Sequence, residues 1–412
     1  MSHPIQFGTS GYRGIIGQTF TSQHVDAIAH GIAHVLNQSE TPSILIAYDT
    51  RLGNDPHCSI GSYTHTLCQR LSYEGVSVTL CDSFTPTPAL SWAVKKGTYT
   101  GGIMLTASHN PASYNGIKFN GSDGAPAPLT VTDKITTIAN QALAGSLDPI
   151  PSLLPYATTS ITDAFCTSLL SLIETKLHLP ISNALTQTIS IDPRFGASIS
   201  TWQSIRTHIP QATLHLIHDS HDPDFGLISP NPSSDISALQ ADIATHQSSM
   251  GIAHDPDADR HVILDEKGQI IRPELLCALF TDYFISRGLP VNELLTTIAS
   301  SGIIKMVAKQ HNLRVHETSV GFKYFTPFLK ESAKESSLSF AVESSGGFSM
   351  SYHTLEKCGF LPALLTLGIV EETGQPLSRL ILNLEKSYTQ FHFLENAITC
   401  PKSSYTDIRS GF

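Results

Sequence analysis

Short runs of apolar residues alternate along this chain with longer stretches in which apolar residues recur every three or four positions. The short runs are typical of buried strands, and the longer stretches are typical of helices that cover a sheet. Helices are expected near 56–74, 87–96 and 273–287, and a further helix is expected between residues 192 and 213. The predicted strands are SILIAYD (43–49), VSVTL (76–80), GGIMLTA (101–107), TISID (188–192), TLHLI (213–217), MGIAHD (250–255), HVILD (261–265), LLTTIAS (294–300) and LSFAV (338–342).

This alternation runs through three rounds, which predicts an α/β protein with three consecutive domains of similar βαβ topology and mixed sheets. The length of 412 residues agrees with this, since a domain holds roughly 150 residues. The Pro-, Ser- and Thr-rich stretch at 149–161 is expected to link a first domain (1–150) to a second (151–249). A third domain is expected at 250–385, followed by a C-terminal remnant at 386–412.

Composition narrows the class of protein. The formal net charge of −10 argues against nucleic acid or an anionic membrane surface as the main partner. No apolar stretch approaches the ~18 residues of a membrane-spanning helix, and the N-terminal segment lacks the basic and apolar regions of a secretory signal. The seven cysteines are scattered and form no CxxC pair, which indicates reduced thiols rather than a disulfide or zinc framework. We therefore expect a cytoplasmic, monomeric or dimeric protein.

The first motif with chemical content is TASHNPASYNGIKFN (106–120), which follows an apolar strand. Ser108 stands at a strand end beside His109 and near Lys118, so it could act as an activated nucleophile or a phosphoryl carrier. For SHNP alone, an ordinary Asn/Pro/Gly-rich turn is an equally good interpretation. A Ser-His-Asp hydrolase is disfavoured, because no GxSxG elbow surrounds the serine.

The second motif is AHDPDADRH (253–261), in which Asp255, Asp257 and Asp259 occupy alternate positions. In an extended loop this spacing turns the carboxylates to one side, where a cation relieves their repulsion. Hard oxygen ligands favour Mg²⁺. Arg260 adds a guanidinium suited to phosphate oxygens. The alternative interpretation is a solvated acidic turn.

Three further segments are individually weak signals. GTSGYRG (8–14) is a glycine-rich turn in which Arg13 could reach an anion, TSVGFKYF (318–325) carries a cation, and VESSGGF (342–348) carries groups suited to sugar hydroxyls. Each is common in loops when taken alone.

Taken together and in this order, the motifs resemble the α-D-phosphohexomutase superfamily (phosphoglucomutase/phosphomannomutase) over residues 5 to about 370. TASHNP together with DPDADR is a highly specific combination, and YDTR (48–51) and IDPRFGAS (191–198) look like the family's connecting segments. Serine in GTSG, where phosphoglucosamine mutases usually read GTDG, is more similar to the glucose and mannose enzymes.

The resemblance implies a phosphoserine mechanism. Ser108 would pass its phosphoryl group to a hexose 1-phosphate, giving a hexose 1,6-bisphosphate that also serves as activator, and then recover the other phosphate to leave hexose 6-phosphate. Asp255, Asp257 and Asp259, with Ser108, would bind Mg²⁺. Proton transfer and support of the reacting groups would fall to Lys118, His109 and Arg13, with the pKa of Lys118 lowered by burial or by Arg13. The matched substrate-binding residues are Thr9, Ser10, Arg260, Gly321, Lys323, Glu343 and Ser345.

Two departures from the family's pattern keep alternatives open. Ser344 stands where the sugar loop often has a second glutamate, with a modest expected effect on sugar preference. The 412 residues contain no RxSGTxP phosphate clamp, so the fourth domain is expected to be missing. Loss of a remote phosphate contact should lower kcat as well as affinity. The chain is therefore expected to be an active mutase, an inactive or weakly active sugar-phosphate-binding relative, or an enzyme with a phosphatase-like side activity.

Overall fold

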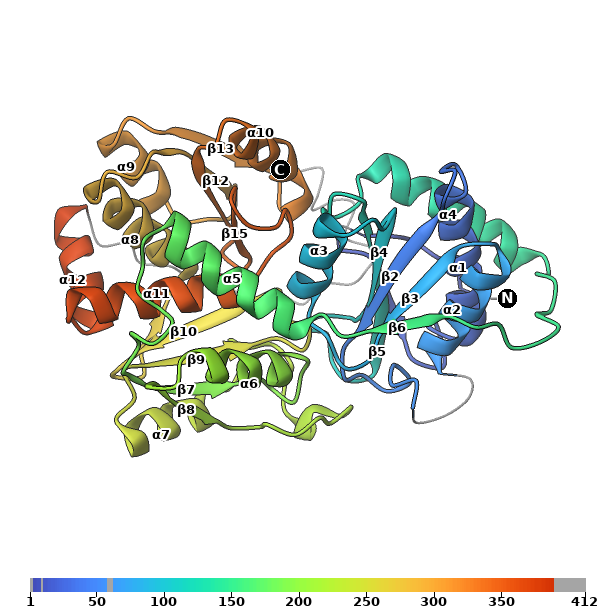
Figure 1. Cartoon of the computed structure of the whole chain (residues 1–412), viewed down its shortest axis with the longest axis horizontal. Helices are drawn as coiled ribbons and strands as arrows, with labels where there is room; N and C mark the ends of the chain where they lie inside the picture. Colours follow the sequence, from blue (N-terminus) through green and yellow to red (C-terminus); the bar gives the residue numbers. More distant parts are fainter. Residues whose placement is uncertain (1–2, 9, 58–61, 389–412) are drawn as a thin grey trace, which may run out of the picture.

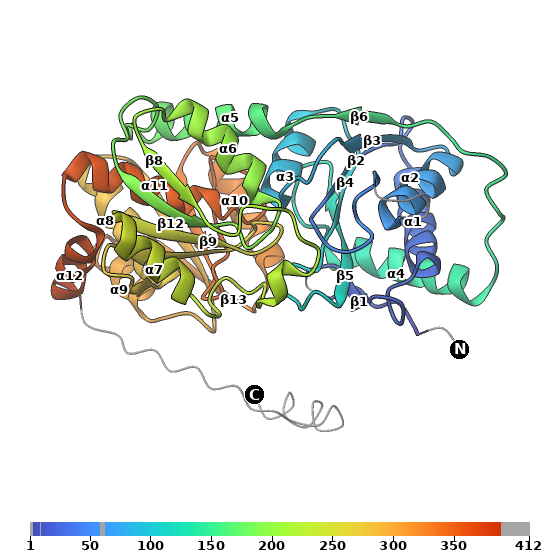
Figure 2. The same cartoon turned by 90° about the horizontal axis from the view of Figure 1, so that it is seen from below.

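The fold is taken from a computed structural model that describes residues 3–8, 10–57 and 62–388. Three mixed sheets follow one another along the chain, each covered by helices, which confirms the predicted three α/β domains. Figure 1 shows the first domain on the right, with the second and third on the left, one below the other. In Figure 2 the segment containing β6 and α5 passes from the first domain to the other two.

The first sheet has six strands in the order β1-β5-β4-β2-β3-β6. The central strands are parallel, whereas β5 runs antiparallel to both β1 and β4. Alternate residues of β2 face opposite layers: Ile44 and Ile46 pack with α1 and α4, while Leu45 and Ala47 pack with α3. The elements are β1 (Tyr12–Ile15), α1 (Ser22–Leu36), β2 (Ser43–Tyr48), α2 (Tyr63–Tyr73), β3 (Ser77–Cys81), α3 (Thr87–Lys96), β4 (Gly101–Leu105), β5 (Tyr114–Gly121), α4 (Leu129–Ala144) and β6 (Ala157–Thr159).

The second sheet has five strands in the order β11-β10-β9-β7-β8, with β7 parallel to β8 and β9. Strand β10 then turns back antiparallel to β9, so a tight loop joins these two neighbours. The elements are α5 (Thr162–Lys176), β7 (Thr188–Asp192), α6 (Ser198–His208), β8 (Thr213–Leu216), the 3₁₀ turn η1 (Phe225–Leu227), α7 (Ser237–His246), β9 (Met250–His254), β10 (His261–Asp265) and β11 (Ile270–Ile271).

The third sheet has four strands in the order β13-β12-β14-β15, of which only β15 is antiparallel to its neighbour. Every residue of α11 from Phe360 to Val370 is buried, in a core that the second and third sheets share. The elements are α8 (Pro273–Ser286), β12 (Val291–Thr297), α9 (Ile303–Gln310), β13 (Arg314–Thr318), η2 (Phe322–Tyr324), α10 (Thr326–Lys334), β14 (Leu338–Val342), β15 (Phe348–Met350), α11 (Phe360–Thr373) and α12 (Leu377–Ser387).

Both predicted domain boundaries need correction. Strand β9 pairs with β7, so residues 250–265 complete the second sheet and do not open the third domain. Strand β6, which lies beyond residue 150, pairs with β3 of the first sheet. A strand that follows a helix has the same apolar pattern whether it extends one sheet or starts another, and only the pairing separates the two cases. Most of the predicted remnant, residues 389–412, lies outside the described residues.

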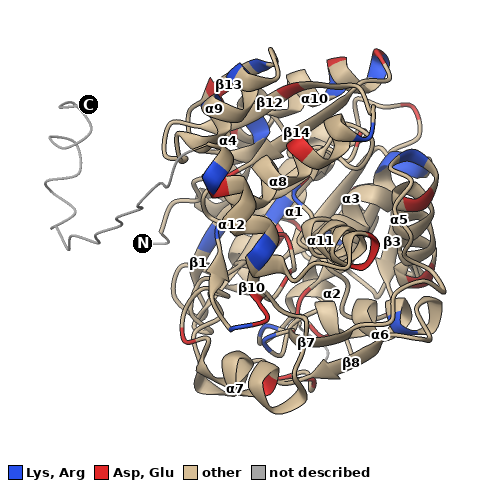
Figure 3. Cartoon of the chain, turned by 90° about the vertical axis from the view of Figure 1, so that its left-hand side faces the viewer, with Lys and Arg blue, Asp and Glu red and all other residues tan. Residues whose placement is uncertain are grey.

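Charged residues make up 15% of the chain and include both signs. Figure 3 shows the side of the second and third domains, where Lys and Arg positions are interspersed with Asp and Glu among mainly uncharged residues. None of the described helices is long and apolar enough to cross a membrane. The cysteines that the structure describes are buried and form no disulfide bond with one another, as expected for small apolar side chains: Cys68, Cys81, Cys166, Cys277 and Cys358.

Candidate active site

Two loops from different domains meet at the centre of the molecule. Ser108 lies just after β4, and the acidic loop 255–260 joins β9 to β10. Strands β4 and β9 both belong to parallel pairs, and both loops lie at the carboxyl ends of those strands. This edge is the usual location of ligand sites in α/β sheets.

Ser108 is fully buried and faces the second domain. Its Oγ donates to Oδ2 of Asp255 over 2.6 Å and lies 3.3 Å from Nδ1 of His109. Its backbone has a φ of +51°, a left-handed conformation that non-glycine residues rarely adopt. The serine side chain is therefore aimed at the carboxylates by an unfavourable local geometry, and the surrounding structure must hold it there.

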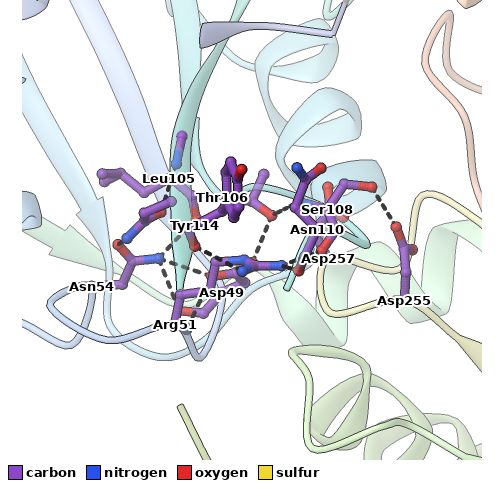
Figure 4. Close-up of polar contacts among 12 residues, drawn as sticks. Asp49, Arg51, Asn54, Leu105, Thr106, Ser108, Asn110, Tyr114, Asp255 and Asp257 are labelled. Carbon is purple, nitrogen blue, oxygen red and sulfur yellow. Dashed lines mark hydrogen bonds and ion pairs between the residues drawn. The ribbon is translucent and has the colours of Figure 1, made fainter. Parts of the chain in front are cut away.

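The Ser108 loop is held by two buried residues that the sequence predictions did not assign to the site. Arg51 donates through its guanidinium to the carbonyl oxygens of Ser108, Asn110, Pro111 and Tyr114. Asp49 accepts from Thr106 Oγ1 over 2.6 Å, and Thr106 Oγ1 accepts from the backbone N–H of Ser108 over 2.8 Å. Figure 4 shows these contacts around the loop. YDTR was noted in the sequence only as a connecting segment.

The aspartates form a cluster suited to a hard metal ion. Asp255, Asp257 and Asp259 are fully buried, and each offers one oxygen to a set in which all oxygens lie within 4.8 Å of one another. Oδ1 of Asp257 and Oδ1 of Asp259 are buried without a hydrogen-bond partner. Unpaired carboxylate oxygens in an enclosed site cost free energy unless a cation binds them. The donor set therefore fits Mg²⁺, which prefers carboxylate and hydroxyl oxygens.

The charges of the cluster change its protonation behaviour. Burial, followed by the neighbouring Asp257 and Asp259 carboxylates, raises the pKa of Asp255 well above its usual range. Burial also acts to raise the pKa of Asp259, but the ammonium groups of Lys118 and Lys357 outweigh it and lower that pKa. The two carboxyl groups are thus driven in opposite directions by the charges that face them.

Lys118 lies on β5 with its ammonium between two of the aspartates. Its Nζ is 2.5 Å from Oδ2 of Asp257 and 2.6 Å from Oδ2 of Asp259. Burial acts to lower the pKa of Lys118, but these carboxylates outweigh it, so the pKa is raised. The expected lowering of this pKa by burial or by Arg13 is therefore wrong for this arrangement, because two full charges at contact distance exceed the cost of desolvation.

Two other residues support the cluster and were not found in the sequence. Lys357 is buried, with its Nζ 3.1 Å from Oδ2 of Asp259 and 3.1 Å from Oε1 of Glu356. Thr87, at the start of α3, donates its backbone N–H to the carbonyl oxygen of Asp257 over 2.9 Å and its hydroxyl to the same residue's carboxylate. A single lysine or threonine in an otherwise ordinary segment gives no sequence signal, since its role depends on packing from a distant part of the chain.

Arg13 and His109 lie on the first-domain side of this centre. Nη1 of Arg13 donates to Oδ1 of Asn110 over 2.5 Å, and burial lowers the pKa of this arginine. Burial also lowers the pKa of His109 to about 4, with Arg260 and Arg13 adding to the effect. The imidazole of His109 is therefore neutral near pH 7, and its lowered pKa makes it a weak base.

A small pocket extends from the cluster toward the third domain. Its lining includes Ser10, Lys118, Lys323 and Lys357, so three cations border it. Gly11 allows the glycine-rich turn to pack against β5, because a Cβ there would lie 2.4 Å from the carbonyl oxygen of Ile117. Thr9 lies outside the described residues.

The sugar-loop residues of the sequence prediction lie beside the acidic loop. Oε1 of Glu343 accepts from the backbone N–H of Gly321 over 3.2 Å, and burial raises the pKa of Glu343. Arg260 pairs with Gly347 in an isolated bridge, and its own backbone N–H donates to Asp255 over 3.1 Å. Ser345, at the tip of the loop, is exposed. The contacts thus connect the sugar loop to the acidic loop through Arg260.

Comparison with known protein families identifies all three domains of the chain. Models of the phosphoglucomutase/phosphomannomutase alpha/beta/alpha domains I, II and III match residues 4–145, 164–268 and 272–388, respectively. The chain belongs to the phosphoglucomutase/phosphomannomutase family. The matched ranges also place the acidic loop in domain II, in agreement with the sheet topology.

Mutases named for different sugars are similar to the chain. A phosphoglucomutase of Staphylococcus haemolyticus is 31% identical over 84% of the chain, and a phosphoglucosamine mutase of Heliobacterium modesticaldum is 27% identical over 92%. The matches span 65% of the first relative and 83% of the second. A putative phosphomannomutase of Thermus thermophilus has 25% sequence identity and a TM-score of 0.83, covering 94% of this chain and 84% of the other. Family membership therefore leaves the sugar open.

Proposed function

We propose that this chain carries the phosphoserine, metal and sugar loops of an Mg²⁺-dependent phosphohexomutase that interconverts hexose 1-phosphates and 6-phosphates. The observation that carries the proposal is the contact of Ser108 Oγ with Asp255, at 2.6 Å, within a buried cluster of three carboxylates. A phosphoryl acceptor and a divalent-metal site at contact distance are what phosphoryl transfer requires. The chain spans only 65% of the first relative, so activity of this polypeptide is part of the proposal.

Asp255, Asp257 and Asp259, together with an oxygen of the phosphorylated Ser108, would hold the Mg²⁺. Bound there, the ion would neutralise charge on the phosphoryl oxygens. Lys118 pairs with Asp257 and Asp259, and Lys357 pairs with Asp259, so these two lysines offset part of the negative charge of the cluster.

In the first half-reaction, a sugar hydroxyl oxygen attacks the phosphorus of phosphorylated Ser108. A new O–P bond forms at the sugar and the bond from phosphorus to Ser108 Oγ breaks. The sugar hydroxyl gives up its proton to a neighbouring base, and the departing Ser108 Oγ takes up a proton to become a free hydroxyl. The resulting hexose 1,6-bisphosphate then turns over, and Ser108 Oγ receives the other phosphoryl group in the reverse sense. This cycle accounts for a bisphosphate as activator, because it supplies the phosphoryl group that primes Ser108.

Proton transfer falls to the groups beside Ser108. His109 is the candidate by position, because its Nδ1 lies 3.3 Å from Ser108 Oγ, but burial and the neighbouring arginines lower its pKa and make it a weak base. Lys118 can share this role only after giving up its ion pairs with Asp257 and Asp259. Arg13, which contacts Asn110 of the same loop, supports the transferring group by its charge.

We assign recognition of the sugar hydroxyls to Glu343 and Ser345, and further substrate binding to Thr9, Ser10, Arg260, Gly321 and Lys323. The turn at Gly321 places its backbone N–H on Glu343 and so fixes that carboxylate. Glucose and mannose phosphates are the proposed substrates, on the basis of serine in GTSG and the glutamate and serine of the sugar loop.

The test is a coupled assay of the 412-residue chain with Mg²⁺, glucose 1-phosphate or mannose 1-phosphate, and a trace of glucose 1,6-bisphosphate. Intact-mass measurement follows phosphorylation of Ser108 in parallel. Turnover together with a phosphate on Ser108 supports the mutase. Phosphate that appears on Ser108 and is lost to water identifies a phosphatase-like activity. Binding of hexose phosphate without either signal favours the binding protein and refutes the mutase.

A further inference from the structure

The peptide of Ser108 is held at both ends by one closed set of hydrogen bonds. Its N–H reaches Asp49 through Thr106 Oγ1, over 2.8 Å and then 2.6 Å. Its carbonyl oxygen accepts directly from the guanidinium of Arg51. Asp49 closes the set, because its Oδ1 accepts the backbone N–H of Arg51 over 3.1 Å and its Oδ2 lies 3.3 Å from Nε of Arg51. Figure 4 shows the hydrogen bonds that connect Ser108 to Asp49 and Arg51.

The rigid, planar guanidinium of Arg51 binds several carbonyl oxygens of the Ser108 loop at once. Besides Ser108, it donates to the carbonyl oxygens of Asn110 at 2.7 Å, Pro111 at 2.9 Å and Tyr114 at 2.8 Å. A planar fork with fixed donor directions sets the relative positions of these carbonyls, which a flexible ammonium cannot do. Phe225 of the second domain packs against Arg51, with the guanidinium carbon 5.0 Å from the ring centre.

We infer that Arg51 is the positioning residue of the reaction, and that it fixes Ser108 in its left-handed backbone so that Oγ meets the carboxylates of the second domain. The inference rests on the proposed function, since positioning matters only if Ser108 carries the phosphoryl group. Phosphoryl transfer depends mainly on alignment, and a shift of the serine by about 1 Å is enough to cost about 10²-fold in rate.

The second domain contains the same device, an aspartate and an arginine that together hold a loop by its carbonyl groups, but its loop lacks the proposed reactive serine. Arg194 donates its backbone N–H to Asp192 Oδ1 over 2.9 Å. Its guanidinium donates to the carbonyl oxygens of Ser229 at 2.7 Å, Ser234 at 2.6 Å and Asp235 at 2.9 Å. The loop that it holds supplies none of the proposed site residues. Arg194 is therefore a matched control, in which the same kind of bonds can be removed away from Ser108.

The experiment compares Arg51→Lys with Arg194→Lys in the full chain. In the mutase assay, we expect Arg51→Lys to lower kcat by about 30- to 100-fold with KM changed by less than about 3-fold, and Arg194→Lys to change kcat by less than about 3-fold. The rate at which glucose 1,6-bisphosphate phosphorylates Ser108 should fall in parallel with kcat. Equal effects of the two substitutions on kcat would overturn the inference.

Hydrogen exchange supplies a readout that does not need activity. Arg51→Lys should speed exchange of the amides in 106–114 and leave those in 229–235 unchanged, and Arg194→Lys should do the reverse. Unchanged exchange in 106–114 refutes the positioning role, even with low activity. If the unsubstituted chain never becomes phosphorylated, the proposed function fails, and the exchange pattern still decides whether Arg51 fixes the loop.

Thr106→Val covers the case in which Arg51→Lys does not fold. This near-isosteric change removes only the link between the N–H of Ser108 and Asp49. We expect a fall in kcat of about 10-fold with faster exchange at the start of the loop. If Thr106→Val has the same kcat and the same hydrogen exchange as the unsubstituted chain, the hydrogen bonds from Asp49 through Thr106 do not position Ser108.

Discussion

The first and second sheets share a local device but contribute different chemistry. In each, an aspartate at the end of a central strand accepts the backbone N–H of an arginine two residues later, and that arginine binds loop carbonyls. In the first domain the loop carries Ser108. In the second domain it carries no proposed site residue, and the clustered carboxylates come from the turn between β9 and β10.

The aspartate–arginine arrangement has the same structural role in both domains. An irregular loop leaves carbonyl groups without sheet or helix partners, and a buried guanidinium provides several donors in fixed directions to satisfy them. The aspartate in turn keeps the buried arginine charge paired. The device therefore stabilises loops in general, and it becomes relevant to catalysis only where the loop bears a reacting group.

The largest expected effect comes from removing the reacting group itself. Ser108→Ala should lower mutase activity by at least about 10³-fold, because the hydroxyl that is proposed to carry the phosphoryl group is then absent. Ser234→Ala, in the corresponding loop of the second domain, should leave activity within about 2-fold. Coupled assays with intact-mass measurement check both. A phosphorylated and active Ser108→Ala chain would show that the comparison assigns the wrong loop.

The second prediction concerns the acidic loop that distinguishes the second domain. Burial and the two neighbouring carboxylates raise the pKa of Asp255, so its charge is unfavourable without a cation. Asp255→Asn should therefore unfold at the same or a higher temperature in EDTA. It should also lose the stabilisation by Mg²⁺, which for an intact site amounts to about 2.7 kcal/mol at a hundred times Kd.

Thermal unfolding in EDTA and in Mg²⁺ measures this effect. Asp222→Asn is the control, since its carboxylate lies in the same domain on an exposed turn and accepts from Asp224 and Gly226. It should keep the full Mg²⁺ response. A full response in Asp255→Asn as well would place the metal elsewhere.

The third prediction separates stability from activity in the paired device. Arg51→Lys and Arg194→Lys should each lower the free energy of unfolding by about 3 kcal/mol, because each leaves buried loop carbonyls unpaired. Urea unfolding should give values within about 1 kcal/mol of each other, although only the first substitution is expected to slow turnover. A much smaller loss for Arg194→Lys would mean that the two devices are not energetically equivalent.

The smallest effect is expected at the junction of the domains. His353 is fully buried against Phe165 of the second domain, and its carbonyl accepts from Lys95 of the first. Burial, followed by Lys95, lowers the pKa of His353 to about 3. A histidine with a depressed pKa stabilises the fold above its unfolded pKa, and this stability is lost as the pH falls from about 6.5 toward the folded value.

Between pH 7 and pH 5, His353 should therefore account for about 2 kcal/mol of the loss in unfolding free energy. His353→Asn should show a correspondingly shallower pH dependence, measured by urea unfolding at both pH values. The other histidines are common to both proteins, so the difference isolates this one. Identical pH dependence would mean that His353 is accessible to protons in the folded state.

The local pattern of the sequence predicted most of the buried strands and the helices α2, α3, α6 and α8, whereas helices α1, α4, α5, α7, α9 and α10 were not recognised. The ranges 188–192, 261–265 and 338–342 are strands β7, β10 and β14, and 87–96 is helix α3, as expected. These elements could be recognised because their own residues carry the apolar periodicity. Strands β1, β5, β6, β11, β13 and β15 were not recognised. Most are short or lie at sheet edges, and β5 reads as an Asn- and Gly-rich turn until β4 pairs with it.

The candidate phosphoryl carrier and metal ligands could be found from the sequence, because Ser108 and the three alternating aspartates lie in motifs whose spacing is local. The folded structure was needed to show that the acidic loop belongs to the second sheet, that Lys118 is ion-paired, and that Lys357 and Thr87 support the carboxylates. It also decided that Arg51 holds the serine loop across 57 positions of sequence. These roles depend on strand pairing and burial between distant segments, and such contacts leave no periodic signal in the chain.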